Sequence, residues 1–465
     1  MLHNTQNISA VIAEKLRDFR IDDFLPIAHR ELDLGKPATP KIGNLVKVII
    51  GMRRSGKSYR LLQEMQTLHA SGIAWERMCY FNFEDDRLGL ITPEIGDAVL
   101  DMFYTMHPDV LNDGVYLFFD ELQEMNQWGS WLRRIVDTTK ATIYVTGSSS
   151  KMLSKEISTE FRGRALDFEL LPYSFREFLA ANGIVDAQLL GRNGKTGYSA
   201  SERMMLMKAM QTYLECGGFP AAQDLPVAQR IALLQSYVQR VVSRDVVERH
   251  DIARPRVAAV TARRVMGSIG KQLSVRKLEN DLRSMGLPTS RELLGDLLDY
   301  FEDAYLMFRM REFSVSLSEQ TTTMPKIYAI DPGLAAASNA AGVRDDGQRL
   351  ENAVYLELRR RNVGFRRDGI SSCRTKTHGY EVDFVVGDLL EREQYELYQV
   401  TASMDDAATA ERETRALWEL MEEQGLDSGI IIVGNGMKRD WLRDGKVIHQ
   451  IPAWQWFLEL PPTVG

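Results

Sequence analysis

The residues with the most defined chemistry lie in the sequence VKVIIGMRRSGKSY, which runs from Val46 to Tyr59. The β-branched apolar run at its start predicts a buried strand, and the pattern GxxxxGKS follows, before a helical pattern begins. Gly51 and Gly56 lack a Cβ, so the loop between them can turn its backbone N–H groups toward an anion, which also faces the positive end of the following helix. This spacing predicts a loop that binds the β- and γ-phosphates of a nucleotide.

Two side chains at the end of this loop have separate expected roles. Lys57 supplies a mobile positive charge to the β- and γ-phosphates, and the Ser58 hydroxyl is a ligand for Mg²⁺. Arg53 and Arg54 make the loop basic. The alternative is a chance match in a glycine-containing turn, which the strand before the loop and the helix after it disfavour.

A second pattern, VYLFFDELQEMNQW at residues 115–128, predicts a central parallel strand that is buried on both faces and ends in two acids. Ligands bind at the carboxyl ends of such strands, so Asp120 and Glu121 should lie beside the phosphate loop. Asp120 is expected to hold the Mg²⁺ shell, and Glu121 to polarise the water that attacks the γ-phosphate. The residues expected to bind ATP are Gly51, Arg53, Arg54, Ser55, Gly56, Lys57, Ser58, Tyr59 and Asp120.

Two further segments carry candidate catalytic residues. The strand predicted over ATIYVTGSSS, residues 141–150, ends in three serines. We choose Ser148 as the polar side chain that senses the γ-phosphate. The alternative is that these serines cap the N-terminus of the next helix. Arg162 and Arg164 flank Gly163 before an apolar strand at 165–171. Either arginine is a candidate for an arginine finger that acts on a neighbouring subunit, and pairing with a surface carboxylate is the alternative.

Five segments, read in order, resemble a known family. They are GMRRSGKS, FFDELQ, VTGSSSKMLSKEISTEFRGRALDFELLPYSFREFL, YLECGGFPAA and YVQRVVSRDVVERHDI. They are similar to bacterial and archaeal AAA-type ATP-binding proteins that carry a C-terminal domain of unknown function. The resemblance implies an oligomerising ATPase and a helical lid over the nucleotide, where Arg240 or Arg244 could contact phosphate. It assigns no cellular task.

Composition limits the remaining possibilities. The chain has 465 residues, with 57 Lys and Arg and 64 Asp and Glu, which gives a net charge of −7. This acidic balance argues against a protein that binds polyanions nonspecifically, although it allows a local basic face. Cys79, Cys216 and Cys373 show no metal-ligand spacing and are expected to be small buried side chains. No apolar run is long enough for a membrane span, and we expect a cytoplasmic protein.

The pattern of predicted elements gives an α/β fold class. We expect a P-loop NTPase sheet of the AAA+ or STAND-like kind with a helical lid, followed by a winged helix and an α/β nuclease-like domain. Helices are expected at 8–20 and 24–34, ahead of the first strand. The expected domains are an N-terminal helical segment at 1–44, the ATPase core at 45–180, the lid at 181–252, the winged helix-turn-helix at 253–325 and the C-terminal domain at 326–465.

The predicted winged helix has two interpretations. Three short helices with a turn at 286–288 and a following strand are typical of a DNA-binding module. The third helix, however, carries many acids, which would repel a phosphate backbone. One interpretation is therefore DNA contact, and the other is domain packing or recruitment of a protein. The residues expected to contact DNA are Arg276, Lys277, Arg283 and Arg291.

The C-terminal part resembles the PD-(D/E)xK nuclease core, as the domain of the related proteins does. Glu351 on a helix and Asp383 on a strand, with Glu381 two residues before it, match that pattern. Gln399 and Thr401 stand where an acid and a lysine are required for Mg²⁺ and the attacking water. We therefore expect a degenerate, binding-only nuclease fold.

The expected function is a Mg²⁺-dependent ATPase whose nucleotide state controls the other domains. The alternatives are a nucleotide-gated DNA-binding switch without turnover and an ATP-dependent nuclease. The expected partners are the nucleotide, further copies of the chain, and DNA or a protein at the C-terminal domains.

Overall fold

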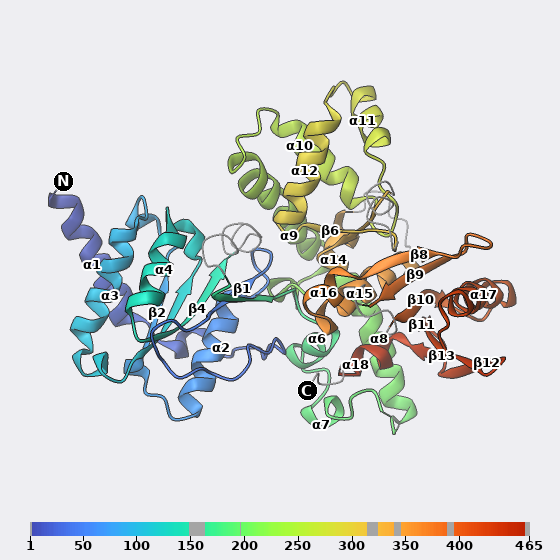
Figure 1. The fold of residues 1–465 in the computed structure, drawn as a ribbon, viewed down its shortest axis with the longest axis horizontal. Helices are drawn as coiled ribbons and strands as arrows, with labels where there is room; N and C mark the ends of the chain where they lie inside the picture. Colours follow the sequence, from blue (N-terminus) through green and yellow to red (C-terminus); the bar gives the residue numbers. More distant parts are fainter. Residues whose placement is uncertain are drawn as a thin grey trace. The chain divides into compact units, whose positions relative to one another are not determined.

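The computed structural model describes residues 2–147, 163–195, 197–313, 324–338, 346–387 and 395–460 (Figure 1). The chain forms two compact units, Met1–Leu170 and Leu171–Gly465. Across the described ranges, no helix combines the length and the apolar character that crossing a membrane would require. The three cysteines are free and buried, as predicted.

The first unit is built on one parallel sheet of five strands in the order β2-β3-β4-β1-β5. This arrangement confirms the predicted parallel α/β sheet, and it places the acidic strand β3 next to β4, with β4 next to β1. Every residue of β1, β3 and β4 is buried, as expected for central strands covered on both faces. The strands are β1 (Val46–Ile50), β2 (Met78–Asn82), β3 (Val115–Asp120), β4 (Ala141–Gly147) and β5 (Ala165–Glu169).

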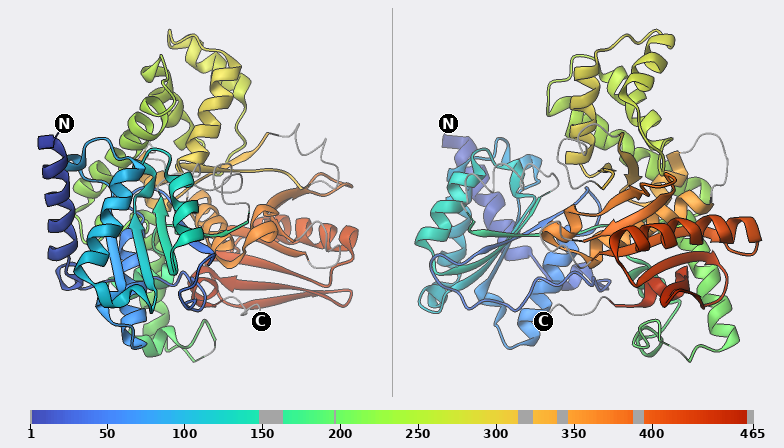
Figure 2. Two further views of the ribbon diagram at one scale, coloured as in Figure 1. Left: turned by 60° about the vertical axis from the view of Figure 1, so that its left-hand side comes forward. Right: turned by 45° about the vertical axis from the view of Figure 1, so that its right-hand side comes forward.

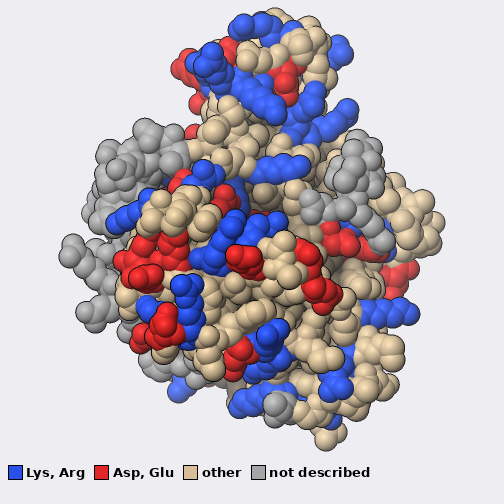
Figure 3. Space-filling model, turned by 90° about the vertical axis from the view of Figure 1, so that its right-hand side faces the viewer, with Lys and Arg blue, Asp and Glu red and all other residues tan. Residues whose placement is uncertain are grey.

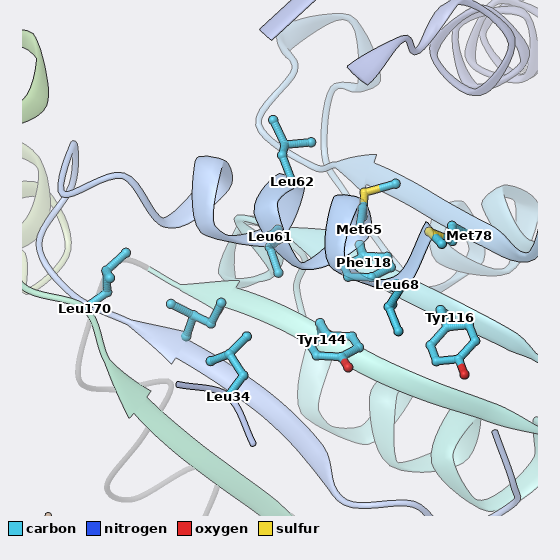
Figure 4. Packing of buried hydrophobic residues seen from close by; sticks show 11 residues of the cluster. Leu34, Leu61, Leu62, Met65, Leu68, Met78, Tyr116, Phe118, Tyr144 and Leu170 are labelled. Carbon is cyan, nitrogen blue, oxygen red and sulfur yellow. The ribbon is translucent and has the colours of Figure 1, made fainter. Parts of the chain in front are cut away.

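Helices cover both faces of this sheet (Figure 2). Leu61 and Leu68 of α2 pack in a buried cluster with Phe118 of β3 and Tyr144 of β4, which form one face (Figure 4). The opposite face carries Phe119, whose ring lies 5.2 Å from that of Trp131 on α4. The helices of this unit are α1 (Leu2–Asp18), α2 (Lys57–Ala70), α3 (Pro93–Met106) and α4 (Trp128–Thr138), with short 3-10 turns at Ile21–Phe24, Trp75–Arg77, Asp86–Leu88, Pro108–Leu111 and Leu122–Glu124.

The helix predicted at 24–34 is wrong. A 3-10 turn ends at Phe24, and residues 25–40 form no helix. Leu25, which precedes Pro26, has an extended backbone with a ψ of 147°, because proline disfavours helical geometry at the residue before it. The apolar residues of this segment nevertheless reach the core, because Leu34 belongs to the cluster beneath α2.

The second unit begins with helices and continues into a small antiparallel pair of strands. The strands β6 and β7 pair with Met307 opposite Ala329. The elements are α6 (Phe175–Ala181), α7 (Ala187–Leu190), α8 (Ala200–Cys216), a 3-10 turn at Pro220–Ala222, α9 (Val227–Arg240), a π-helical stretch at Val241–Glu248, α10 (Pro255–Met266), α11 (Val275–Ser284), α12 (Arg291–Asp303), β6 (Met307–Met310), β7 (Lys326–Ala329) and α14 (Pro332–Ser338).

A mixed sheet of six strands, in the order β12-β13-β11-β10-β9-β8, completes the second unit. Helix α17 packs on strands β9, β10 and β11, and its Leu417 and Leu420 share a buried cluster with Ile431 and Ile448 (Figure 2). The remaining elements are α15 (Asp346–Arg361), α16 (Gly364–Asp368), β8 (Ser371–Arg374), β9 (Glu381–Val386), β10 (Glu396–Ser403), α17 (Ala407–Gln424), β11 (Ser428–Asn435), β12 (Arg439–Arg443), β13 (Lys446–Pro452) and α18 (Ala453–Leu458).

Asp331 ties β7 and α14 to the end of α8. Its carboxylate accepts hydrogen bonds from the backbone N–H groups of Gly218, at 2.6 Å, and Leu334, at 2.8 Å, and burial raises the pKa of Asp331 to about 6. A Cβ on Gly333 would lie 2.2 Å from the carbonyl oxygen of Cys216. This close backbone contact explains the need for glycine and packs the start of α14 against the end of α8.

Candidate functional site

The loop between β1 and α2 has the backbone geometry that an anion cradle requires. Gly51 extends β1 with a φ of +155°, and a Cβ there would lie 2.2 Å from the carbonyl oxygen of Leu170. Arg54 and Gly56 have φ values of +70° and +98°, so left-handed residues alternate with right-handed ones along the loop. Such alternation turns successive N–H groups to one side, where the N-terminus of α2 adds its positive dipole.

The Lys57 side chain is buried at the start of α2, and its residue is only 3% exposed. Its ammonium donates long hydrogen bonds to the carbonyl oxygens of Gly51 and Met52, both at 3.2 Å, and lies 3.8 Å from Glu121 Oε1. Neutral carbonyls compensate an ammonium only in part. Lys57 is therefore placed to give a stronger bond to an anion that enters the loop.

Ser55 lies at the turn of the loop and is fully buried. Its carbonyl oxygen accepts a 2.7 Å hydrogen bond from Arg30 Nη1, which fixes the loop from outside. Its hydroxyl oxygen has no hydrogen-bond partner among the residues that the structure describes. A buried hydroxyl is normally satisfied, so this atom is consistent with a site that a polar ligand completes.

Asp120 is fully buried at the end of β3. Its carboxylate accepts hydrogen bonds from the hydroxyls of Ser58, Thr146 and Tyr80, the last at 2.9 Å. Burial and the neighbouring Glu121 raise the pKa of Asp120 above its ordinary value. The structure thus brings together a hydroxyl and a carboxylate oxygen, donors that fit a Mg²⁺ ion shared with a nucleotide.

Glu121 follows β3 with a left-handed backbone, at a φ of +50°. Its backbone N–H donates to Thr146 Oγ1 at 2.9 Å, and its carboxylate accepts a hydrogen bond from Gln123 Nε2. These contacts hold Glu121 beside Lys57, on the loop side of β3. The two predicted acids therefore lie next to each other, but Asp120 is bound by hydroxyl groups, whereas Glu121 lies beside the Lys57 ammonium and the Gln123 amide.

Thr146 is a residue that the sequence argument missed. It lies on β4, is fully buried, and donates to Asp120 Oδ1 while accepting from the backbone of Glu121. The register pairs Val145 with Phe119, so the next residue on β4 comes level with Asp120. The strand carries two threonines, Thr142 and Thr146, so polarity alone did not single out Thr146; its position next to the end of the strand was the available signal. The predicted sensor Ser148, with Ser149 and Ser150, lies outside the described residues.

The basic and aromatic residues of the loop have other partners or are exposed. Arg53 forms ion pairs with Glu84 and Glu124, both at 3.3 Å. Tyr59 is 45% exposed, and Arg54 is exposed as well.

Of the two candidate arginine fingers, the structure describes only Arg164. Arg162 lies outside the described residues. Arg164 is about half exposed and pairs with Asp137 of α4, which is the alternative that we considered for it.

The C-terminal carboxylates meet around a lysine that the sequence argument also missed. Lys326 of β7 is 8% exposed, and its ammonium lies 2.6 Å from Glu381, 3.1 Å from Glu351 and 3.6 Å from Asp383. Tyr328 donates a 2.7 Å hydrogen bond to Glu351. Burial opposes the charge of Lys326, but the three carboxylates outweigh it and raise the pKa of the lysine. Burial and Glu351 raise the pKa of Asp383.

Gln399, at the degenerate third position, contacts the backbone of Asp383 and the carboxylate of Glu413. Its Oε1 accepts from the backbone N–H of Asp383 at 3.3 Å, and its Nε2 donates to Glu413 at 2.7 Å. Thr401 donates to the carbonyl of Ser403 at 3.2 Å. Within the described ranges, no group of three or more His, Cys, Asp or Glu side chains is arranged to hold a metal ion.

The residues expected to contact DNA separate into two pairs. Arg283 and Arg291 both bind Glu279, at 3.1 and 2.7 Å. Arg276 and Lys277 are exposed. In the expected lid, Arg244 lies on an exposed surface 4.0 Å from Glu248.

Comparisons with known proteins give the following matches. An AAA domain model matches residues 43–179, and the model of a domain of unknown function (DUF8612) matches residues 207–346. The chain is 33% identical over 461 residues to the uncharacterized protein MJ1544 of Methanocaldococcus jannaschii, with 97% of each chain covered. It is 26% identical over 342 residues to an uncharacterized protein of Haemophilus influenzae, covering 74% of this chain and 79% of that protein. Among solved structures, the Walker-type ATPase PABY2304 of Pyrococcus abyssi has a TM-score of 0.39 at 14% identity, covering 63% of this chain and 90% of that one.

Proposed function

The chain belongs to the same family as the archaeal protein MJ1544 and contains an AAA domain, and we propose that it binds ATP with Mg²⁺ and hydrolyses the γ-phosphate. The observation that carries this proposal is the meeting of Lys57, Asp120 and Glu121 at the carboxyl ends of β1 and β3. The ammonium of Lys57, the two carboxylates and the backbone N–H groups of the loop together provide the charges that a magnesium triphosphate requires.

Each residue of the site has a separate role in phosphoryl transfer. The backbone N–H groups between Gly51 and Ser58 hold the phosphates, and Lys57 moves its ammonium from two carbonyl oxygens to the β- and γ-phosphates. Ser58 and Asp120 would hold Mg²⁺, which neutralises phosphate charge when it is bound. Glu121 orients the attacking water and accepts its proton.

Hydrolysis is favoured over passive binding because Glu121 is held by its backbone and not only by its side chain. The backbone N–H of Glu121 donates a hydrogen bond to Thr146, and this bond does not involve Lys57. When the phosphates of a nucleotide draw Lys57 away from the Glu121 carboxylate, the backbone bond still holds Glu121 in position to act. A switch without turnover is the second candidate, since the contact of Gln123 with the Glu121 carboxylate could keep it from the water.

A single-turnover measurement of ATP hydrolysis with Mg²⁺ tests the first candidate. We expect Glu121→Gln to keep ATP affinity and to lower the hydrolysis rate about 10²- to 10⁴-fold, because the substitution removes a general base. Equal rates in the two proteins would contradict hydrolysis through Glu121 and leave the switch as the better description.

The second unit, in this proposal, responds to the nucleotide and does not cut nucleic acid. We propose that residues 181–252 act as a lid, that 253–325 form a winged helix, and that 326–465 form a degenerate nuclease-like domain. The order α15, β8, β9, β10, α17, β11 supports the last assignment. Lys326 already neutralises Glu351 and Glu381, so little charge remains for a metal. Nicking of plasmid DNA by the protein that disappears in Asp383→Ala would contradict this assignment.

We further propose that the chain acts as a homo-oligomer in which Arg162 or Arg164 reaches the nucleotide of a neighbour. Mixing inactive Lys57→Ala chains with inactive Arg164→Ala chains tests whether an arginine acts in trans. Recovery of hydrolysis in the mixture is the expected result if Arg164 has this role, and no recovery would leave Arg162 as the candidate.

A further inference from the structure

A basic hollow of about 520 Å³ lies in the second unit, between α10 and α11. Arg263 and Arg264 come from the last turn of α10, Lys271 from the connection that follows, and Lys277 from the first turn of α11. One acid, Asp281, also lines it. Figure 3 shows basic side chains gathered on the lobe that α10, α11 and α12 form at the top of the view.

The four cations of this hollow are exposed and available. Among the described residues, none of them forms an ion pair with a carboxylate, and the side chain of Arg264 contacts only the sulfur of Met285, at 3.5 Å. Arg283 on α11 and Arg291 on α12 are by contrast bound to Glu279. Four like charges around one concavity repel one another, so an anionic ligand would stabilise them.

Helix α12 is a poor surface for a polyanion. It carries five acidic residues and one basic residue, and Glu292 and Asp296 are exposed. In a helix-turn-helix the second helix of the pair usually enters the major groove, but these acids would repel the phosphates beside it. A nucleic acid that binds this lobe is therefore expected on the α10 and α11 side.

The lining of the hollow also restricts the kind of nucleic acid. None of the described residues that line it is aromatic, whereas proteins that bind single strands commonly stack bases on aromatic side chains. The side chains present are long cations, which suit backbone phosphates. The choice of duplex DNA rests on the winged helix proposed above for residues 253–325. The geometry of that module fits B-form DNA, while the major groove of duplex RNA is too deep and narrow for it.

We propose that the hollow between α10 and α11 binds the backbone phosphates of duplex DNA through Arg263, Arg264, Lys271 and Lys277, without reading its sequence. This replaces Arg283 and Arg291 in the predicted DNA contact and keeps Lys277. The site lies wholly in the second unit, so the residues that form it are separate from those that bind the nucleotide.

The test is fluorescence anisotropy with the full chain and a labelled 20-base-pair duplex of arbitrary sequence, without nucleotide, from 50 to 200 mM NaCl. In the double variant Arg263→Gln/Lys277→Gln we expect duplex affinity to fall at least about tenfold. The slope of log affinity against log salt should fall by about 2, since each lost phosphate contact removes about 0.9. All four of the charges in the hollow are exposed, so the variant should unfold at the same temperature as the parent.

The matched control is Arg283→Gln/Arg291→Gln, which removes the same charge from the same lobe, at positions on α11 and α12 outside the hollow. We expect its affinity to stay within about threefold of the parent, because those arginines already bind Glu279. An equal loss in both variants would mean a nonspecific charge effect and would overturn the site. So would absence of binding at 50 mM salt, or tighter binding of single-stranded DNA or duplex RNA of the same length. Because the assay contains no ATP, none of these results bears on hydrolysis.

Discussion

Two buried lysines, Lys57 and Lys326, lie beside carboxylates and have different surroundings. Lys57 contacts two neutral carbonyls at 3.2 Å, and its nearest acid, Glu121, is 3.8 Å away. Lys326 has Glu381 at 2.6 Å and Glu351 at 3.1 Å. The first ammonium is weakly compensated and can bind a ligand anion, whereas the second is already neutralised within the fold. A lysine among acids therefore indicates a ligand site only when the acids leave its charge available.

The largest effect on stability is expected from Lys326→Met. It removes the ammonium from one buried carboxylate, Asp383, and from two partly buried ones, and breaking a buried charge pair costs about 3–5 kcal/mol. Chemical denaturation of the second unit measures the loss. Lys208→Met, an exposed position on α8, is the control and should change stability by less than about 0.5 kcal/mol.

Adding Glu381→Gln to Lys326→Met should restore part of the lost stability, because one negative charge fewer is left unpaired. A loss below about 1 kcal/mol for Lys326→Met would contradict the comparison of the two lysines.

An intermediate effect is expected from Thr146→Val. The valine keeps the volume and removes the hydroxyl that links Asp120 to the backbone of Glu121, so hydrolysis should slow about tenfold through loss of one hydrogen bond to a charged group. Thr142→Val is the matched control on the same strand, since its hydroxyl is also buried but bonds Ala38 and Asn44. Equal slowing in both variants would assign the effect to the strand and not to the acids.

The smallest effect on stability is expected from Arg164→Ala. This arginine and Asp137 are both about half exposed, and exposed ion pairs contribute about 0–1 kcal/mol. Thermal unfolding of the variant should therefore resemble that of the parent. A loss of hydrolysis in this otherwise stable variant would support a role for Arg164 at a neighbouring nucleotide, and a large drop in unfolding temperature would contradict the exposed pair.

The sequence predicted the first unit well because its signals are local. The run Val46–Ile50, the glycine spacing after it and the apolar strand ending in Asp120 each occupy a few consecutive residues. The helix predicted at 24–34 failed because an apolar pattern outweighed Pro26 in the prediction.

Thr146 and Lys326 could not be predicted in the same way. The role of Thr146 follows from the register of β4 against β3, which places it level with Asp120. Lys326 lies on β7, and its partners come from α15 and β9, so only tertiary packing brings them together. The nuclease-like motif predicted for residues 326–465 suggested an absent lysine at Thr401, and a pattern of adjacent residues carries no information about a lysine from another strand.

Calorimetric titration of ATP with Mg²⁺ into the parent protein and into Lys57→Ala tests the central claim most directly. The claim is that Lys57 holds a charge available for the phosphates of ATP at the loop after β1. We predict binding heat with the parent and at least a hundredfold weaker binding, or none, with Lys57→Ala, since a charged contact at a buried site contributes about 3 kcal/mol. No heat with the folded parent, or the same affinity in both proteins, would contradict it.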